Sequence, residues 1–259
     1  MPRVSPYVLI PVLAVGACSK PADKAAPPAE TTAAPAAAPA PPAPAGPQAI
    51  VTVLYKWPKS PAAFEKYYPT HIKIVSDGQA EIGFTKAELT KFTAGIDGKK
   101  PQFYRQAELY FPDTAAARKG MATEAFKKVG DDFKNFASGG LIGLFAVETG
   151  DKSETGCPAL VTVVYHAPKD ATAFESYYPT HIKIVSDGQS EIGFDRADLT
   201  KFVSNLDGSA PAEYRQAELC FASMEALKKG TSTAAFKRVG DDFKNFASGG
   251  LVGMIGEQK

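Results

Sequence analysis

Two histidines, His71 and His181, are the side chains in this sequence best suited to acid–base chemistry. Each lies in one copy of a segment that occurs at residues 67–79 and again, letter for letter, at residues 177–189. Imidazole takes up and releases a proton near neutral pH, so both histidines are candidate catalytic acids or bases. A structural role stays open, in which each histidine caps a helix break after the nearby proline and hydrogen-bonds the neighbouring backbone.

Polar side chains around each histidine can complete a ligand-binding site. Some lie beside the histidine in the repeated segment, and others lie on a strand predicted further along the chain. The candidate ligand-binding residues are Tyr67, Tyr68, Lys73, Tyr104, Arg105, Glu108, Tyr177, Tyr178, Lys183, Tyr214, Arg215 and Glu218.

The residue pattern predicts no metal and no cofactor at these positions. One histidine in each repeated segment, together with His166, does not make a metal-ligand set. The sequence also contains no glycine-rich phosphate loop, nucleophile elbow or Cys-x-x-Cys motif. The carboxylate pairs Asp131–Asp132 and Asp241–Asp242 have no further carboxylates at nearby alternate positions, so they indicate solvated helix ends rather than a cation site.

The repeated segment belongs to a tandem duplication. The two copies align at a constant separation of 110 residues, without insertion or deletion. A repeat of this kind predicts two structural units built to one plan. We place the first repeat at residues 49–149, a linker at 150–158 and the second repeat at 159–259.

The N-terminus predicts export and attachment to a membrane. Residues 1–18 contain an early arginine and an apolar run too short to span a bilayer, and they end at Cys18. Val15-Gly16-Ala17-Cys18 resembles the bacterial lipobox, in which the cysteine is lipidated, and Ser19 after it suggests the outer membrane. An ordinary signal peptide with an incidental cysteine is the alternative. The expected location is the cell envelope of a Gram-negative bacterium, where the chain is lipid-anchored and faces the periplasm.

Composition separates a spacer from the folded part of the chain. Residues 19–48 are rich in alanine and proline and predict a disordered, extended linker. The chain as a whole is 44% hydrophobic and 22% charged, which is ordinary for globular domains. Its formal net charge is +1 and no long basic run occurs, so we expect no nucleic-acid partner.

Each repeat predicts the element order β-α-β-β-α-β. In the first repeat, residues 50–55 are β-branched and aromatic and predict a strand. Ser60-Pro61 should begin a helix that Pro69 ends or kinks. Further strands are predicted at residues 88–93, 103–111 and 141–147, and further helical segments at 114–119 and 123–129.

This order is the ferredoxin-like pattern, in which helices cover only one face of a sheet. The other face is partly apolar and needs a partner, which a second repeat can provide. We therefore expect an α+β fold in which two ferredoxin-like repeats pack as an intrachain dimeric α+β barrel, a monomeric pseudo-dimer. Two separate domains in a row are the alternative, and the short linker argues against them.

The second repeat contains a possible disulfide. Cys157 precedes its first predicted strand and Cys220 ends its third. These two strands are antiparallel neighbours in the ferredoxin-like pattern, so the start of one lies beside the end of the other. An oxidising periplasm would permit the bond, and two free thiols are the alternative. The first repeat has Pro47 and Tyr110 at the matching positions and cannot form it.

A series of motifs in order resembles the EthD family of the dimeric α+β barrel superfamily. It consists of Tyr-x-x-Pro after the first strand, Phe-x-x-Tyr-Tyr-Pro-Thr-His-Ile, Tyr-x-x-Ala-Glu-Leu-x-Phe and Asn-Phe-Ala-Ser-Gly-Gly. The resemblance covers residues 50–148 and again 160–257. It implies relatives named after ethyl tert-butyl ether degradation, usually short, cytoplasmic, single-repeat homodimers. More distant relatives bind haem, for which His71 or His181 would be the axial candidate.

Taken together, these patterns predict a cell-envelope lipoprotein that binds or transforms a small hydrophobic molecule in a pocket of the barrel. One alternative is a non-catalytic structural or protein-interaction module tethered to the membrane. Another is an oxidoreductase or degradation accessory enzyme of the EthD type. A pocket lined by the histidines would favour a ligand, whereas a barrel filled by side chains would favour the interaction module.

Overall fold

The computed structural model describes residues 47–149 and 156–258. The predicted signal peptide, Cys18 and nearly all of the predicted spacer lie outside these residues. The first repeat comprises β1 (Ala49–Tyr55), α1 (Pro61–Asp77), α2 (Gln79–Ile82), β2 (Lys86–Gly95), β3 (Arg105–Phe111), α3 (Thr114–Met121), α4 (Glu124–Asp132), the 3-10 turn η1 (Phe133–Asn135) and β4 (Leu141–Glu148). The second comprises β5 (Ala159–His166), α5 (Ala171–Asp187), α6 (Gln189–Ile192), β6 (Arg196–Asn205), β7 (Glu213–Phe221), α7 (Met224–Thr231), α8 (Ala234–Asp242), η2 (Phe243–Asn245) and β8 (Leu251–Gln258).

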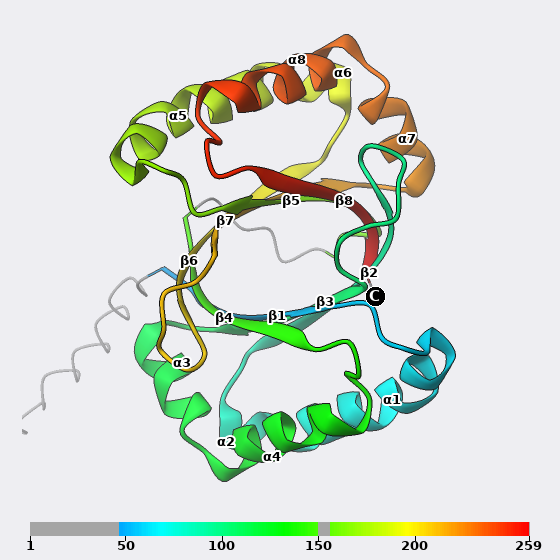
Figure 1. Cartoon of the computed structure of the whole chain (residues 1–259), viewed down its shortest axis with the longest axis vertical. Helices are drawn as coiled ribbons and strands as arrows, with labels where there is room; N and C mark the ends of the chain where they lie inside the picture. Colours follow the sequence, from blue (N-terminus) through cyan, green and yellow to red (C-terminus); the bar gives the residue numbers. More distant parts are fainter. Residues whose placement is uncertain (1–46, 150–155, 259) are drawn as a thin grey trace, which may run out of the picture. The chain divides into compact units, whose positions relative to one another are not determined.

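The strands of both repeats form one closed antiparallel barrel in the order β1-β3-β2-β8-β5-β7-β6-β4. The repeats meet where β2 pairs with β8 and where β4 pairs with β6, and each of these pairings contains a register shift. Figure 1 shows the helices of the two repeats on opposite outer sides of the barrel. The predicted intrachain barrel is thereby confirmed. Closure also removes the unpaired edges that an isolated sheet would expose.

Alternation along each strand divides the core into an inner and an outer part. On β1, Ile50 and Leu54 face the barrel interior, where they pack with residues of both repeats, such as Phe92 of the first and Phe202 of the second. Val51 faces the opposite way, toward the helices of its own repeat. Successive side chains of a strand point to opposite faces of the sheet, so one strand contributes residues both to the barrel interior and to the layer beneath the helices.

Helix α1 continues through Pro69, so the predicted end of the helix at this proline is wrong. Ser60 accepts a hydrogen bond from the backbone of Ala63 and caps the start of the helix, as its sequence indicates. A proline inside a helix costs about 3 kcal/mol. Three side chains on one face of α1, Phe64, Tyr68 and His71, are almost fully buried, and burial of this extent outweighs that cost. Because the helix is continuous here, His71 does not cap a helix break, and the structural interpretation that gave it this role is wrong.

Cys157 and Cys220 form a disulfide in the second repeat, with their Cα atoms 5.4 Å apart. Cys220 lies on β7, and its neighbour on β5 in the antiparallel register is Leu160. Both sulfur atoms are buried together with Leu160 in a small cluster. The pairing of β5 with β7 therefore brings the two cysteines together.

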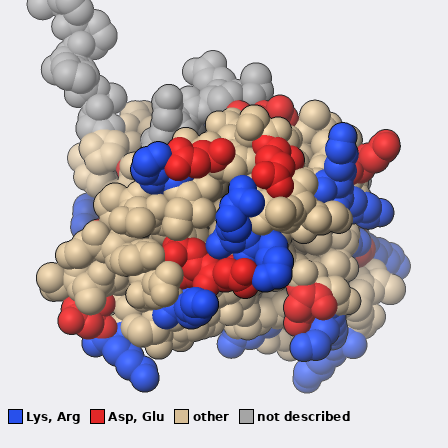
Figure 2. Space-filling view, turned by 90° about the horizontal axis from the view of Figure 1, so that it is seen from above, with Lys and Arg blue, Asp and Glu red and all other residues tan. Residues whose placement is uncertain are grey.

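Charged side chains of both signs are mixed on the outer surface. Figure 2 shows basic and acidic side chains beside one another on one face of the molecule. On α5 and α8 such neighbours include Lys183 with Asp187 and Lys237 with Asp241, each four residues apart in one helix. Among residues 47–149 and 156–258, no helix has the length and apolar character needed to cross a membrane.

Candidate functional site

His71 on α1 is held by Asp132, the last residue of α4, through a hydrogen bond between their side chains. His71 Nδ1 lies 2.9 Å from Asp132 Oδ2, and both side chains are buried. The other carboxylate oxygen, Oδ1, accepts hydrogen bonds from the Tyr67 hydroxyl at 2.7 Å and from the Asn135 amide at 2.8 Å. Three groups therefore converge on one carboxylate, which fixes the orientation of the imidazole.

Burial and these hydrogen bonds set the protonation states of the pair. Burial lowers the pKa of His71 below its ordinary value, although Asp132 acts in the opposite direction. Burial by itself raises the pKa of Asp132, but the three hydrogen bonds at its carboxylate together hold it below its ordinary value. At neutral pH the carboxylate is ionised and the imidazole is neutral. Nδ1 then donates its proton to Asp132, and the lone pair lies on Nε2.

One tyrosine hydroxyl contacts this nitrogen, and a second tyrosine ring lies beside the imidazole. The Tyr55 hydroxyl lies 3.5 Å from His71 Nε2, and the Tyr68 ring stacks beside the imidazole with 6.1 Å between the ring centres. Burial raises the pKa of Tyr55 well above its ordinary value and that of Tyr68 to about 12, so both hydroxyls are neutral at neutral pH. The two hydroxyls also interact with each other, and Tyr68 is only 4% exposed. The contact between Tyr55 and Nε2 is long for a hydrogen bond, so both groups retain capacity to bind a ligand group.

The second repeat contains the same arrangement. His181 Nδ1 lies 2.8 Å from Asp242 Oδ2, and the Tyr165 hydroxyl lies 3.3 Å from His181 Nε2. Burial lowers the pKa of His181 as well. The Tyr178 hydroxyl is buried, and it has no hydrogen-bond partner in the described part of the chain. One chain thus carries two equivalent histidine–aspartate pairs.

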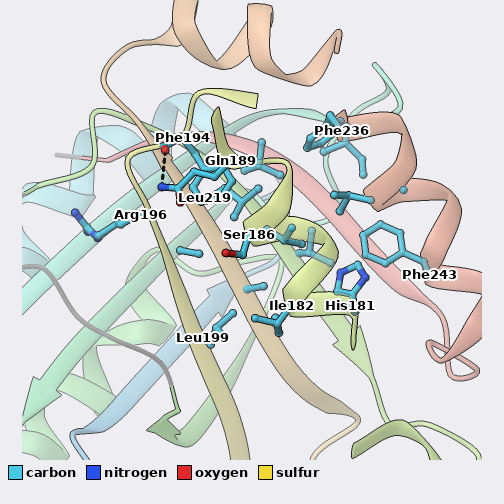
Figure 3. Close-up of a pocket in the computed structure, with 18 of the residues that line it drawn as sticks. His181, Ile182, Ser186, Gln189, Phe194, Arg196, Leu199, Leu219, Phe236 and Phe243 are labelled. Atoms are coloured by element: carbon cyan, nitrogen blue, oxygen red, sulfur yellow. Dashed lines mark hydrogen bonds between the residues drawn. The ribbon is translucent and has the colours of Figure 1, made fainter. Parts of the chain in front are cut away.

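Each histidine lines an apolar cavity between the sheet and the helices of its repeat. The cavity that contains His71, the repeat-1 pocket, has a volume of about 560 Å³, and the cavity that contains His181, the repeat-2 pocket, has about 440 Å³. Figure 3 shows the repeat-2 pocket with His181 beside Phe243 at one end and Arg196 at the other. Most of its wall is aliphatic or aromatic, from side chains such as Val161, Val163, Ile182, Val185, Leu199, Leu219 and Phe236. A cavity of this size with few polar groups is the usual form of a small-molecule site.

The arrangement combines an oriented base with an apolar chamber. His71 Nε2 can accept a hydrogen bond or a proton from a molecule in the repeat-1 pocket. Asp132 can stabilise the imidazolium that proton transfer would form, and the Tyr55 hydroxyl beside Nε2 can donate to an oxygen atom of the same molecule. Each pocket can therefore hold a mainly apolar molecule with one hydroxyl or weakly acidic C–H group.

Several residues predicted for the site lie elsewhere. Lys73 is 73% exposed and pairs with Asp77 at 2.7 Å, and Lys183 does the same with Asp187. Both lysines point to solvent because they lie on the outer face of their helices. Glu108 and Glu218 lie on the opposite face of the sheet from the pockets, in the barrel interior. There Glu108 accepts a hydrogen bond from Thr52 and Glu218 one from Thr162.

Tyr104 and Arg105 form a separate polar cluster with Glu65 on α1. Arg105 Nη2 lies 2.6 Å from Glu65 Oε2, and the Tyr104 hydroxyl donates to Oε1 at 2.5 Å. Although burial acts to raise it, these hydrogen bonds hold the pKa of Glu65 at about 2. The Arg105 guanidinium lies 4.8 Å from the centre of the Tyr68 ring, so this cluster supports that tyrosine from outside the pocket. Tyr214, Arg215 and Glu175 repeat it.

Tyr67 and Tyr177 belong to the site through the carboxylates rather than through the pockets. Each donates a hydrogen bond to the aspartate that orients the histidine of its repeat, Asp132 or Asp242. Sequence reasoning placed these aspartates at a solvated helix end, and that interpretation is wrong for Asp132 and Asp242. The spacing of Val129, Asp132 and Phe136 at three and four residues was a signal that the carboxylate faces inward.

Tyr55 and Tyr165 were also missed, because each appeared only as the last apolar residue of a predicted strand. The Nε2 atom of His71, which haem iron would need as its axial ligand, lies 3.5 Å from the Tyr55 hydroxyl. Within residues 47–149 and 156–258, no group of three histidine, cysteine or carboxylate side chains is placed to hold a metal ion.

Comparison with known proteins identifies relatives of one repeat and of the whole barrel. A family model described as the EthD domain matches residues 56–140. An uncharacterised 11.0 kDa protein of the thcB–thcC intergenic region of Rhodococcus erythropolis is 36% identical over 103 residues, which are 38% of this chain and 92% of that protein. The relative therefore has about the length of a single repeat.

Two solved structures share the fold of both repeats. An anthrone oxidase-like protein is 13% identical with a TM-score of 0.57, over 82% of this chain and 92% of that one. A candidate monooxygenase from Fusobacterium nucleatum is 15% identical with a TM-score of 0.51, over the same shares of the two chains. These similarities establish the architecture of the barrel.

Proposed function

This chain belongs to the EthD domain family, and from that premise we propose that each repeat binds a small, mainly apolar molecule that bears one hydroxyl or weakly acidic C–H group. The observation that carries the proposal is the pairing, in the wall of a mainly apolar pocket, of a neutral histidine Nε2 with a tyrosine hydroxyl at a long distance from it. In the repeat-1 pocket these groups belong to His71 and Tyr55, and in the repeat-2 pocket to His181 and Tyr165. The ligand would donate to the imidazole and accept from the tyrosine in place of their long contact, and its apolar part would fill the chamber.

Proton transfer is the chemistry that these groups would supply. A carboxylate on Nδ1 raises the ability of Nε2 to take a proton, because it stabilises the positive imidazolium. Burial opposes this by favouring the neutral ring, so the base is present at neutral pH. The pockets support ligand binding over a purely structural module. No observation on the described residues favours the oxidoreductase alternative in its own right.

Titration with 4-propylphenol tests the proposal, since this probe carries one hydroxyl on an apolar body. We expect the ¹⁵N signals of His71 and His181 to shift on addition of the probe to the full-length protein in detergent. His71→Gln should abolish the shift that the probe causes at the backbone amide of Gly130 in the repeat-1 pocket and leave the response of His181 in place, and His181→Gln should do the reverse, with Gly240 as the reporter. If no member of a panel of alkylphenols, ketones and ethers moves either histidine, the proposal is wrong.

We also propose that the protein is a lipoprotein of the cell envelope, anchored through Cys18. The support is the lipobox-like sequence that ends at Cys18, the alanine- and proline-rich spacer after it, and the disulfide between Cys157 and Cys220, a bond typical of oxidising compartments. Two signals on one chain, a lipid and a spacer, would place the barrel in the periplasm at a distance from the membrane.

Metabolic labelling with an alkyne fatty acid tests the anchor. We expect label on the wild-type protein and none on Cys18→Ser, whereas Cys157→Ser with Cys220→Ser should keep the label because those residues lie in the folded part. On a density gradient, Ser19→Asp should move the protein from the outer to the inner membrane. Unlabelled wild-type protein would contradict the lipid anchor.

A further inference from the structure

The turn that follows β2 and the turn that follows β6 each reach across to the other repeat. We call residues 95–100 arm 1 and residues 205–210 arm 2. In Figure 1, arm 1 extends from the first repeat toward the second, and arm 2 extends from the second toward the first. The Ile96 backbone N–H donates to the Gly253 carbonyl of β8, and the Leu206 N–H donates to the Gly143 carbonyl of β4, each at 3.0 Å.

Each arm places one large aliphatic side chain in the pocket of the opposite repeat. Ile96 of the first repeat lines the repeat-2 pocket, whose other lining residues all come from the second repeat. Leu206 and Asp207 of the second repeat line the repeat-1 pocket, whose other lining residues all come from the first. Each pocket is therefore completed by the opposite repeat.

Two glycines make this crossing possible. A Cβ atom at Gly253 would lie 2.3 Å from Ile96 Cδ1, and one at Gly143 would lie 2.6 Å from Leu206 Cδ1. Real Cβ atoms do not approach so closely, so any larger residue at these two positions would displace the side chain of the arm that passes there. The two side chains are buried to different extents. Ile96 is 37% exposed, whereas Leu206 packs against the buried core of the first repeat.

The remaining walls of the two pockets are nearly the same. Among the lining residues that occupy equivalent positions in both pockets, only Lys86 and Arg196 differ in type. The repeat-1 pocket also includes Tyr68 and Thr85 and is the larger of the two. Wall residues that are the same in both pockets cannot make the pockets select different ligands. A difference in selectivity therefore has to originate at the few positions that vary.

We infer that Ile96 and Leu206 are specificity-determining residues that act in trans, each setting the size of the ligand that the opposite repeat accepts. The inference rests on the proposed binding of a small apolar molecule in these pockets. The repeat-2 pocket, which Ile96 completes, has the smaller volume and would take slimmer ligands. The repeat-1 pocket, which Leu206 completes, has the larger volume and would take bulkier ones.

The test uses full-length protein in detergent and two probes, 4-propylphenol and the bulkier 4-tert-butylphenol. Gly130 lines the repeat-1 pocket and Gly240 the repeat-2 pocket, so their backbone amide signals report binding at each site separately. Ile96→Ala removes apolar contact with the ligand, so it should weaken the binding of 4-propylphenol in the repeat-2 pocket about five- to tenfold, as reported by Gly240. Binding in the repeat-1 pocket, as reported by Gly130, should not change. Leu206→Ala should do the reverse.

The double exchange Ile96→Leu with Leu206→Ile gives a conservative second test. We expect the preference for the bulkier probe to move from the Gly130 site to the Gly240 site. The matched control, Lys99→Ala, changes an exposed side chain of arm 1 that lines neither pocket and should leave both preferences as they are. Equal effects on both sites, or an effect on the arm's own repeat, would overturn the inference while the binding function stands. Failure of the wild-type protein to bind either probe would overturn both.

Discussion

Replacing Asp132 by asparagine is expected to reverse the tautomer of His71. Oδ1 of Asp132 accepts from Tyr67 and Asn135, and Oδ2 faces His71 Nδ1. In the variant, the single side-chain oxygen would stay with its two donors and the new amide NH₂ would face Nδ1. The imidazole would then carry its proton on Nε2 and present a donor to the pocket instead of a lone pair. The ¹⁵N chemical shifts of the ring nitrogens measure this exchange directly.

The functional consequence is a loss of the hydrogen bond that the proposed ligand donates. We expect binding of 4-propylphenol to the repeat-1 pocket to fall about tenfold or more, since one hydrogen bond to a favourably placed acceptor contributes about 0.5–1.5 kcal/mol and the wrong tautomer adds a repulsive N–H. Asp242→Asn is the matched control and should change only His181. An unchanged Nδ1–H tautomer at His71 would show that Asp132 does not determine the proton position.

Raising the pH is expected to destabilise the barrel through the buried carboxyl groups of its interior. Glu218 is 5% exposed and accepts hydrogen bonds from Gln106 and Thr162, both at 3.0 Å. Burial first, and then the charges of Glu108 and Glu88, raise the pKa of Glu218 well above its ordinary value. The protonated form therefore belongs to the folded state.

The neighbouring groups support this assignment. The Tyr110 hydroxyl lies 2.7 Å from Glu88 Oε2 and 2.9 Å from Glu108 Oε2. This hydroxyl therefore joins Glu88 and Glu108, the two groups whose charges add to burial in raising the pKa of Glu218. Lys86 pairs with Glu88, and Arg196 pairs with Asp198 at 2.9 Å, so cations offset part of the negative charge at the edge of the cluster.

The sign of the pH effect follows from a folded-state pKa above the unfolded one. Stability from Glu218 is fully present below its ordinary pKa of 4.5 and is lost as the pH rises through the folded-state value. The loss amounts to about 1.4 kcal/mol for each pH unit within that window. Urea unfolding from pH 5 to pH 9 should show a falling free energy of unfolding.

Glu218→Gln isolates this contribution, because the amide oxygen can accept the same hydrogen bonds and does not ionise. The variant should lose most of the decline between pH 5 and pH 9 and become more stable than the wild-type protein at pH 9. Glu257→Gln, at an exposed position of β8, is the matched control and should keep the decline. Parallel pH profiles for Glu218→Gln and wild type would contradict a protonated carboxyl in the core.

Much of the fold could be predicted because its signals are local or repeated. The strand at residues 50–55 is a run of β-branched and aromatic residues, and the cap at Ser60-Pro61 marks a helix start, so both predictions need only neighbouring residues. The exact duplication around His71 and His181 gave two units of one kind. Closure into a barrel then followed from the apolar inner face that one ferredoxin-like sheet leaves uncovered.

Some residues predicted for the site line the pockets, and others lie elsewhere in the fold. His71 and Tyr68 line the repeat-1 pocket as expected, whereas Glu108 lies on the other side of the same sheet. The helix continues through Pro69 because the free energy gained by burying side chains on one face exceeds the cost of the lost hydrogen bond. Helix propensity describes single residues and does not include this gain from burial. The face to which a strand residue points depends on register and bulges, which are set by pairing with distant strands.

By itself, the sequence determined the duplication, the order of elements, the two histidines and the pair of cysteines, since composition, period and identity are properties of the chain alone. Only the tertiary structure decided which groups surround the histidines. Asp132 meets His71 across 61 residues, and Ile96 enters the pocket of the other repeat. These contacts join segments far apart in the chain, and they arise because barrel closure fixes where each helix and each arm must lie.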